Sequence, residues 1–427
     1  KPELFKLQKK TQISNEKIIC DLFIKTVCFS KPVHLNVAFE EPLSDFLSLP
    51  SFKIQNKIKY TLKNDDHTVF DSSLVKGYKK IIILFGCANK RILSENIITK
   101  LSQCNNIVVL KETTSNINNT SFFGKIDQLI APIEHHENSS DLFNKIKPEL
   151  LITVGGMVIS KKIKTMLRAY RPAAHIHLGH NDAKDTFYCG VEHFKIDPDL
   201  FFKTCLDKFF SSYNYKKLWV DISKKRELAH IKYINDAPFS DLKVFSLLQA
   251  RIPSNYTIQV SNSSTIRYMQ LFDYSPLSKV YCNRGTSGID GSTSTAIGAS
   301  VKSACPTLLI TGDLSFFYDS NGLWNSHIKP SFRIIVINNK GGGIFKILPG
   351  YKNNLISTEF IETKHELTTK HLAKMYGFDY LKTKSEIGLK WNLYNFFNRS
   401  SKPRILEIST NSDLSSELLK KYFINLK

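Results

Sequence analysis

The chain has no run of about 18 apolar residues, the length that a helix needs to cross a bilayer, although 42% of its 427 residues are hydrophobic. Its first residues, KPELFKLQKK, are basic, and no apolar stretch follows them as it would in a secretory signal peptide. The eight cysteines include no C-x-x-C pair, which argues against a disulfide framework and against a zinc ribbon. These absences predict a soluble, cytoplasmic protein with reduced thiols.

Acidic residues are few beside the basic ones. The chain has 59 Lys and Arg against 38 Asp and Glu, a formal net charge of +21. A clustered positive charge is typical of nucleic-acid-binding proteins. Here the lysines are spread along the whole chain, and no basic stripe with interleaved aromatic side chains occurs. We therefore expect small anionic substrates rather than nucleic acid.

Length and periodicity predict more than one α/β domain. A chain of 427 residues exceeds one ordinary core. Short apolar runs alternate with helical patterns, which indicates tandem doubly wound parallel sheets. The predicted domains are residues 1–45, 46–220 and 221–427.

Individual elements follow from the same patterns. We expect a helix over 15–26, a buried strand over 32–39, a linker over 53–77 and a helix over 94–103 capped by Ser94. The strands predicted for the first sheet are 79–86, 105–112 and 148–156, and those for the second are 257–262, 279–283, 306–313 and 332–339.

Polar residues collect where the strands of the second predicted sheet end, and ligands of such sheets bind beyond the carboxyl ends of the strands. Asp313 and Asn339 offer the oxygen ligands that magnesium prefers, and magnesium commonly bridges to phosphate oxygens. The glycines at 341–343 would let the backbone approach a diphosphate closely. The alternative is structural: Asp313 caps the helix after it, and Asn338 with Asn339 makes a turn.

Three longer stretches carry a resemblance to a known family. The Gly-Asp…Asn-Asn pattern resembles the thiamine diphosphate motif of transketolase-like and pyruvate-decarboxylase-like enzymes. The stretches NRGTSGIDGSTSTAIGAS (283–300), TGDLSFFYDSNGLWN (311–325) and VINNKGGGIFKILPG (336–350) resemble the 2-succinyl-5-enolpyruvyl-6-hydroxy-3-cyclohexene-1-carboxylate synthase family of menaquinone biosynthesis. A weaker similarity extends through PELLITVGGMVISKKIK and PVHLNVAFEEPL.

The resemblance implies the thiamine diphosphate-dependent enzyme fold and a transferase reaction. In this reaction 2-oxoglutarate is decarboxylated and the resulting succinyl-semialdehyde carbanion adds to isochorismate. The implied ligands of Mg²⁺ or Mn²⁺ are Asp313, Asn339 and the Gly341 carbonyl. The implied cofactor-binding residues are Ser287, Gly288, Ile289, Gly312, Asp313, Leu314, Ser315, Asn339, Gly341, Gly342 and Ile344.

Substrate contacts are implied in the same way. Asn262, Ser263, Arg267 and Arg284 match substrate-facing, catalytic positions, and a guanidinium group binds a carboxylate through two parallel hydrogen bonds. The implied apolar wall comprises Ile344, Phe345 and Leu348. Without the family, Arg267 would be assigned to a surface ion pair, and Ile289 could be an ordinary core residue.

The family also has a pyrimidine-binding domain that carries a catalytic glutamate. We expect residues 1–45 to be the end of such a domain. The rest of the domain, about 100 to 150 residues, would be missing because the sequence is incomplete, because the gene has decayed, or because the domain is a separate chain. We therefore expect no efficient turnover by this chain alone. The resemblance implies homodimers or homotetramers. Two other functions stay open, another thiamine diphosphate-dependent 2-oxo acid decarboxylase or synthase and a non-catalytic fragment.

One further pattern lies in the middle of the chain. In HIHLGH, strand spacing places His175 and His177 on one face, an arrangement compatible with zinc. No cysteine or carboxylate in the adjoining sequence completes a ligand set, so a structural role is favoured.

Overall fold

The computed structural model describes residues 2–29, 32–37, 72–88, 92–180, 183–209, 212–275, 278–348, 350–351 and 354–427. The chain forms two compact units. One comprises residues 1–69 and 180–182, and the other residues 70–179 and 183–427. Among the described residues, no helix combines the length and apolarity that crossing a bilayer requires.

The first unit contains α1 (Pro2–Phe29), which confirms the helix predicted over 15–26. The buried strand predicted over 32–39 is wrong where it can be judged, because residues 32–37 form no strand and are exposed. A strand needs a paired neighbour for its backbone groups, and none of the described strands pairs with this segment. Residues 38–39 and most of the predicted linker, 53–71, lie outside the described residues.

The first sheet of the second unit is fully parallel, with the order β2-β1-β3-β4-β5. Its strands are β1 (Ile81–Phe85), β2 (Ile107–Lys111), β3 (Leu150–Val154), β4 (Ala174–Leu178) and β5 (Glu192–Phe194). The associated helices are α2 (Glu95–Gln103), α3 (Ile126–Ile130), α4 (Ser139–Ile146), α5 (Lys161–Ala169) and α6 (Pro198–Cys205). All three predicted strands are confirmed. Ser94 precedes α2 as predicted, but its hydroxyl caps no amide of that helix.

The second sheet is also parallel, with the order β10-β11-β9-β8-β6-β7. Its strands are β6 (Thr257–Val260), β7 (Lys279–Cys282), β8 (Thr307–Gly312), β9 (Arg333–Asn338), β10 (Asp379–Thr383) and β11 (Arg404–Ser409). Its helices are α8 (Asp241–Gln249), α9 (Ser264–Met269), α10 (Ser292–Lys302), α11 (Asp313–Tyr318), α12 (Lys370–Met375), α13 (Glu386–Phe396) and α14 (Ser412–Asn425). The four predicted strands are confirmed, and the fold is the predicted pair of tandem α/β parallel sheets.

The central strands of both sheets are buried on both faces, which is why they appear in the sequence as nearly continuous apolar runs. Every residue of β1, β3 and β9 is buried. Alternate side chains enter different cores: Ile335 and Ile337 pack in one cluster, Ile334 and Val336 in the other. Each such side chain contributes about 1.5 to 3 kcal/mol to folding.

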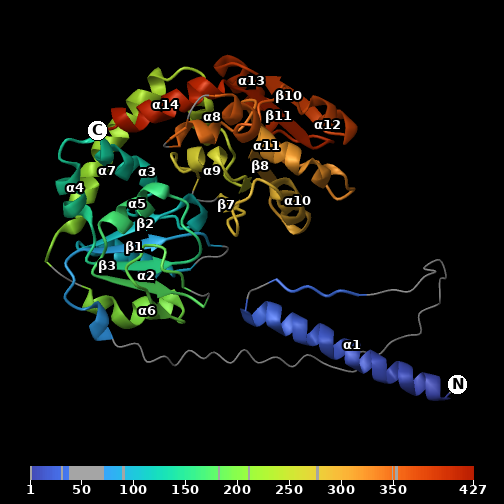
Figure 1. Ribbon diagram of the computed structural model, residues 1–427, viewed down its shortest axis with the longest axis horizontal. Helices are drawn as coiled ribbons and strands as arrows, with labels where there is room; N and C mark the ends of the chain where they lie inside the picture. The colour runs from blue at the N-terminus through green and yellow to red at the C-terminus, as the bar shows by residue number, and fades with distance from the viewer. Residues whose placement is uncertain are drawn as a thin grey trace. The chain divides into compact units, whose positions relative to one another are not determined.

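A long helix and polar contacts join the two sheets. In α7 (Tyr215–Asp236), Trp219 packs into a core of the first sheet and Ile234 into a core of the second. Figure 1 shows α7 beside α14, and the two helices are in contact. Asn116, which follows β2, pairs with the backbone of Val280 in β7 by both its amide oxygen and its amide nitrogen, at 2.8 and 3.1 Å.

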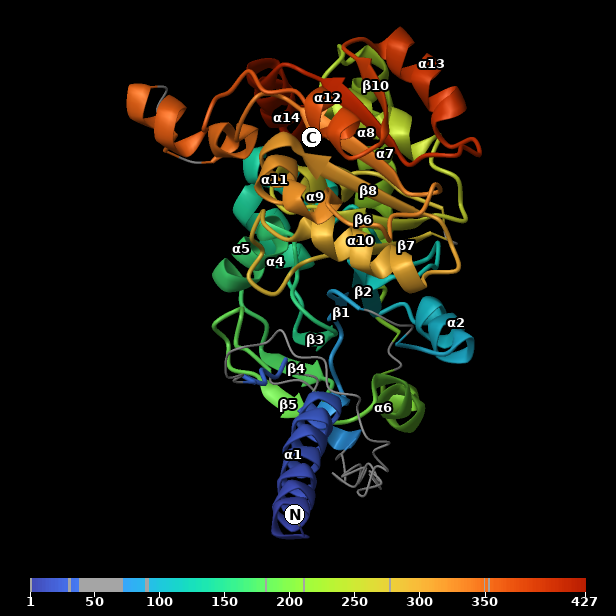
Figure 2. The same cartoon turned by 90° about the vertical axis from the view of Figure 1, so that its right-hand side faces the viewer.

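The strand order of the second sheet determines where a ligand can bind. The chain passes from β6 to β7 on one side and then returns to β8 on the other side of β6, so the order reverses between β6 and β8 (Figure 2). In open parallel sheets, ligands bind at the carboxyl ends of the strands at such a reversal. The segments after β6, β8 and β9 are therefore the candidate site.

Candidate functional site

A pocket of about 100 Å³ lies at the carboxyl ends of β6, β8 and β9. Three short segments form most of its wall, one following each of these strands. Ile289, from the loop after β7, and α8 close it. Its lining residues are Asp241, Phe245, Asn262, Ser263, Ser264, Thr265, Tyr268, Ile289, Gly312, Asp313, Leu314, Ser315, Ile337, Asn339, Gly341, Gly342, Gly343 and Phe345.

Asp313 is a buried carboxylate at the first residue of α11, with 3% of its surface exposed. Its Oδ1 accepts from the Leu314 amide at 2.7 Å, and its Oδ2 accepts from the Gly341 amide at 3.0 Å. The His365 Nε2 atom lies 3.2 Å from the same Oδ2. These contacts join the end of β8 to the glycine turn after β9 and hold the carboxylate in one orientation.

Asn339 has one satisfied and one unsatisfied amide atom. Its Nδ2 donates to Asp241 Oδ2 at 3.0 Å. Its Oδ1 is buried and has no hydrogen-bond partner among the described residues. Burial, together with the nearby charge of Asp313, raises the pKa of Asp241. A buried amide oxygen without a donor is costly unless another group occupies that position.

The glycine turn after β9 tolerates no larger residue at its first glycine. Gly341 has φ +143°, and a Cβ there would lie 2.8 Å from the Glu362 carbonyl oxygen. The Gly342 amide donates to that carbonyl at 2.6 Å. The Glu362 carboxylate is itself buried and lies 3.2 Å from the Lys346 ammonium. The turn is therefore rigidly held beside the pocket.

The end of β6 contributes a strained residue and a positioning residue. Ser263 has φ +71°, a conformation that a non-glycine residue adopts at a cost of about 1 to 3 kcal/mol and that clusters at functional sites. Asn262 is buried, and its Nδ2 donates to the carbonyls of Asn283 at 2.7 Å and Gly288 at 2.6 Å. Its Oδ1 accepts from Arg284 Nη1 at 2.6 Å. Asn262 therefore holds the loop after β7 and orients Arg284.

Two arginines lie near this end of the sheet. Arg267 Nη1 donates to the Ser263 carbonyl at 2.7 Å, and the side chain lines a smaller pocket next to the first. Burial lowers the pKa of Arg267, and the positive charge of Arg284 lowers it further. The Arg284 Nε atom is buried without a hydrogen-bond partner among the described residues. Arg267 and Arg284 therefore form a positively charged region in which the Arg284 Nε–H group can still donate a hydrogen bond.

The remaining predicted residues are distributed around the pocket. Ser315 donates its hydroxyl to the Ile289 carbonyl at 2.5 Å, which ties α11 to the loop after β7. Ser287 and Gly288 belong to that loop but do not line the pocket. Phe345 lines the main pocket and Ile344 the smaller one, whereas Leu348 lines neither.

Sequence reasoning did not identify Asp241 or His365. Asp241 lies at the start of α8, where a serine-aspartate pair indicates only a helix start. His365 follows a π-helical segment, η7 (Ser357–Ile361), and no local pattern marks it. Both reach Asn339 or Asp313 only through the tertiary fold.

The donor set fits a hard divalent cation. Asp313 supplies carboxylate oxygen, the unsatisfied Oδ1 of Asn339 supplies amide oxygen, and the Gly341 carbonyl can accept a second contact besides the Gly343 amide that bonds it at 3.0 Å. Magnesium takes few protein oxygens of this kind and leaves its other positions to water and phosphate.

The comparisons with known proteins agree on one family, although no family model matches the chain. The 2-succinyl-5-enolpyruvyl-6-hydroxy-3-cyclohexene-1-carboxylate synthase of Christiangramia forsetii is 41% identical, over 100% of this chain and 74% of the relative. The synthase of the same name from Flavobacterium johnsoniae is 43% identical, over 94% of this chain and 73% of the relative. The synthase of the same name from Porphyromonas gingivalis is 33% identical, over 92% of this chain and 69% of the relative. Identity at this level over nearly the whole chain means that the chain belongs to the 2-succinyl-5-enolpyruvyl-6-hydroxy-3-cyclohexene-1-carboxylate synthase family.

Proposed function

We propose that this chain is a thiamine diphosphate-dependent synthase of menaquinone biosynthesis. It would join the four-carbon unit left after decarboxylation of 2-oxoglutarate to isochorismate, with release of carbon dioxide. The names of the relatives support the proposed product, 2-succinyl-5-enolpyruvyl-6-hydroxy-3-cyclohexene-1-carboxylate. Magnesium, or manganese, would hold the cofactor's diphosphate.

One observation carries the proposal: the buried Asn339 Oδ1 that lacks a partner, beside the buried carboxylate of Asp313. Together with the Gly341 carbonyl they would hold the cation. Gly341, Gly342 and Gly343 all line the pocket, and glycines without side chains would let a diphosphate approach the backbone of this turn closely. When bound, thiamine diphosphate supplies the electron sink for decarboxylation of a 2-oxo acid.

The chain's own residues would orient the substrates. Both proposed substrates carry carboxylates, and Arg267 and Arg284 offer guanidinium donors near the pocket. Asn262 keeps Arg284 in place through its 2.6 Å contact. Phe345 would present an apolar surface to the reacting carbons and exclude water.

The family's catalytic glutamate belongs to a pyrimidine-binding domain. We infer that turnover requires that domain and that the active site is completed within a homodimer or homotetramer.

The test is carbon dioxide release from 2-oxoglutarate, with isochorismate, thiamine diphosphate and Mg²⁺ present. It is run on this chain alone and on the chain supplied with a pyrimidine-binding domain of the family. We expect turnover with that domain and little without it, and 2-oxoglutarate should be used in preference to pyruvate. A preference for pyruvate would assign the chain to a different decarboxylase. Cofactor binding with no turnover in either preparation would indicate a non-catalytic protein.

A further inference from the structure

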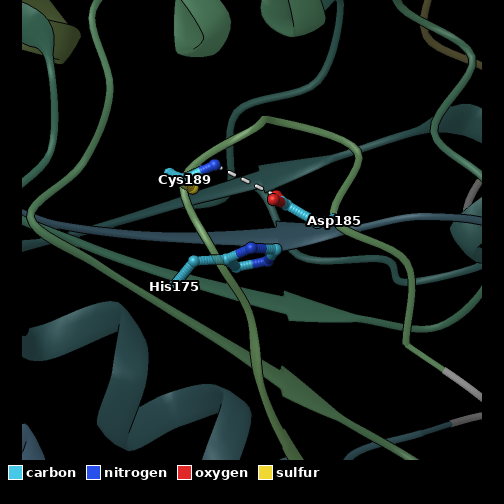
Figure 3. A group of neighbouring side chains, drawn as sticks. All are labelled: His175, Asp185 and Cys189. Carbon is cyan, nitrogen blue, oxygen red and sulfur yellow. Dashed lines mark hydrogen bonds between the residues drawn. The ribbon is translucent and has the colours of Figure 1, made fainter.

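A second cluster of potential ligands lies beside the first sheet, away from the pocket described above. His175 belongs to β4, and Asp185 and Cys189 belong to the loop between β4 and β5. A ring nitrogen of His175, a carboxylate oxygen of Asp185 and the Cys189 sulfur all lie within 4.8 Å of one another. Figure 3 shows the two loop residues facing each other next to the His175 ring.

The His175 ring has one nitrogen available. The residue is 5% exposed. Its Nε2 lies 2.9 Å from the Thr153 hydroxyl, whereas its Nδ1 is buried without a hydrogen-bond partner among the described residues. If Nε2 carries the proton and donates it to Thr153, Nδ1 presents a lone pair. This is the usual arrangement of a metal-bound histidine, in which the other ring nitrogen is fixed by a hydrogen bond.

The loop holds its two ligands in a defined geometry. The Asp185 carboxylate accepts from the Cys189 amide at 3.1 Å and from the Gly190 amide at 3.0 Å. Each oxygen keeps a further lone pair for a cation. Tyr188, immediately before Cys189, has a left-handed backbone conformation with φ +57°, which turns the chain at this point. Cys189 is a half-buried free thiol, and Asp185 is exposed, which leaves a path for an ion to enter.

We propose that His175, Asp185 and Cys189 bind a zinc ion whose fourth ligand is water. Imidazole, thiolate and carboxylate together suit zinc, whereas the all-oxygen set at Asp313 suits magnesium. Zinc–ligand bonds of about 2.0 to 2.3 Å place tetrahedral ligands roughly 3.5 Å apart, so a small closing movement of the loop completes the site. On binding, a zinc–sulfur bond forms and the Cys189 proton leaves to solvent. The ion would fasten the loop to β4.

The test uses the full chain, freed of metal by a chelator and titrated with Co²⁺ or Zn²⁺ alone. We expect one Co²⁺ to bind with thiolate-to-cobalt charge-transfer absorption that Zn²⁺ abolishes and excess Mg²⁺ does not. Cys189→Ser should remove the absorption. Asp185→Asn, which keeps one oxygen for a loop amide but removes the negative charge, should weaken binding tenfold or more. Cys305→Ser, at an exposed cysteine elsewhere, is the matched control and should change nothing.

A second readout needs no variant. Zn²⁺ should slow alkylation of Cys189 in the unaltered chain and leave alkylation of Cys305 unchanged, as measured by peptide mass spectrometry. The proposal is overturned if the unaltered chain shows no charge-transfer absorption, if the absorption survives in Cys189→Ser, or if Zn²⁺ leaves the alkylation of Cys189 unaffected.

Discussion

Asn339 and Asp241 form a buried contact in which the Asn339 Nδ2 atom donates to Asp241 Oδ2 over 3.0 Å. Asp241 is in turn fixed by the Thr410 hydroxyl at 2.5 Å. Because the only donor of the Asn339 amide is its nitrogen, the contact with Asp241 Oδ2 determines that the amide oxygen faces away from Asp241. The oxygen is then the atom left to accept a cation.

The first prediction tests this orienting role. Asp241→Ala should raise the dissociation constant of Mg²⁺, measured by calorimetry with thiamine diphosphate present, by about 10- to 100-fold, the usual effect of removing a residue that orients a metal ligand. Asp221→Ala, at an exposed position of α7, is the control and should leave the constant unchanged. If both variants have the same Mg²⁺ dissociation constant, Asp241 does not orient a metal ligand.

The second prediction concerns the backbone at the glycine turn. Gly341→Ala should destabilise the protein by more than about 1 kcal/mol, because alanine is strained at positive φ, and here its Cβ would also meet the Glu362 carbonyl at 2.8 Å. Gly298→Ala, within α10 and with open space around its Cβ, should instead stabilise by about 0.5 to 1 kcal/mol. Urea unfolding measures both. Similar effects of the two changes would contradict the assigned geometry.

The third prediction separates substrate from cofactor. Replacing Arg267 or Arg284 with Ala should weaken use of 2-oxoglutarate or isochorismate by about 2 to 5 kcal/mol, the cost of removing one partner of a buried charge pair. Cofactor affinity should change little. Arg399→Ala is the control, because Arg399 is exposed. If thiamine diphosphate affinity collapses while substrate kinetics are unchanged, the two arginines serve the cofactor instead.

The fourth prediction concerns pH. Burial raises the pKa of Glu112 from 4.5 to about 7, and Glu112 is 2% exposed. Between these values the unfolded chain releases the proton while the folded chain keeps it, so this carboxyl's contribution to stability falls as pH rises through that window. Above the folded pKa, the loss is on the order of 3 kcal/mol.

Glu112→Gln removes this titration and keeps an oxygen for the Ser160 amide, which donates to Glu112 Oε1 at 3.0 Å. Relative to the unaltered chain, the variant should therefore gain stability as pH rises from about 4.5 to about 8. Urea unfolding of both proteins across that range measures the difference. A difference independent of pH would show that Glu112 does not titrate as described.

The sequence predicted the strands of both sheets where burial on both faces leaves a continuous apolar run, as in β1 and β9. It also placed Asp313 and Asn339 together, because parallel strands bring their carboxyl ends to one edge of a sheet. The strand expected over 32–39 failed because an apolar run shows hydrophobicity but not the presence of a pairing partner.

Contacts between distant segments could not be read from local patterns. Asp241 and Asn339 are 98 positions apart, and nothing near either residue indicates the other. Asn262, which was expected to face substrate, lines the pocket, but no local pattern indicated that its side chain also bonds the loop after β7 and Arg284. No cysteine or carboxylate was expected to complete a ligand set with His175, but the fold brings ligand atoms of Asp185 and Cys189 within 4.8 Å of its ring nitrogen.

The most direct test of the central claim, that Asp313 holds the cation that binds the diphosphate, is calorimetry of thiamine diphosphate binding to Asp313→Asn with and without Mg²⁺. Asparagine keeps oxygen for the Gly341 amide but removes the charge. The account predicts that Mg²⁺-dependent binding is lost while circular dichroism shows a retained fold and Asp221→Asn binds normally. Unchanged Mg²⁺-dependent affinity in folded Asp313→Asn would contradict it.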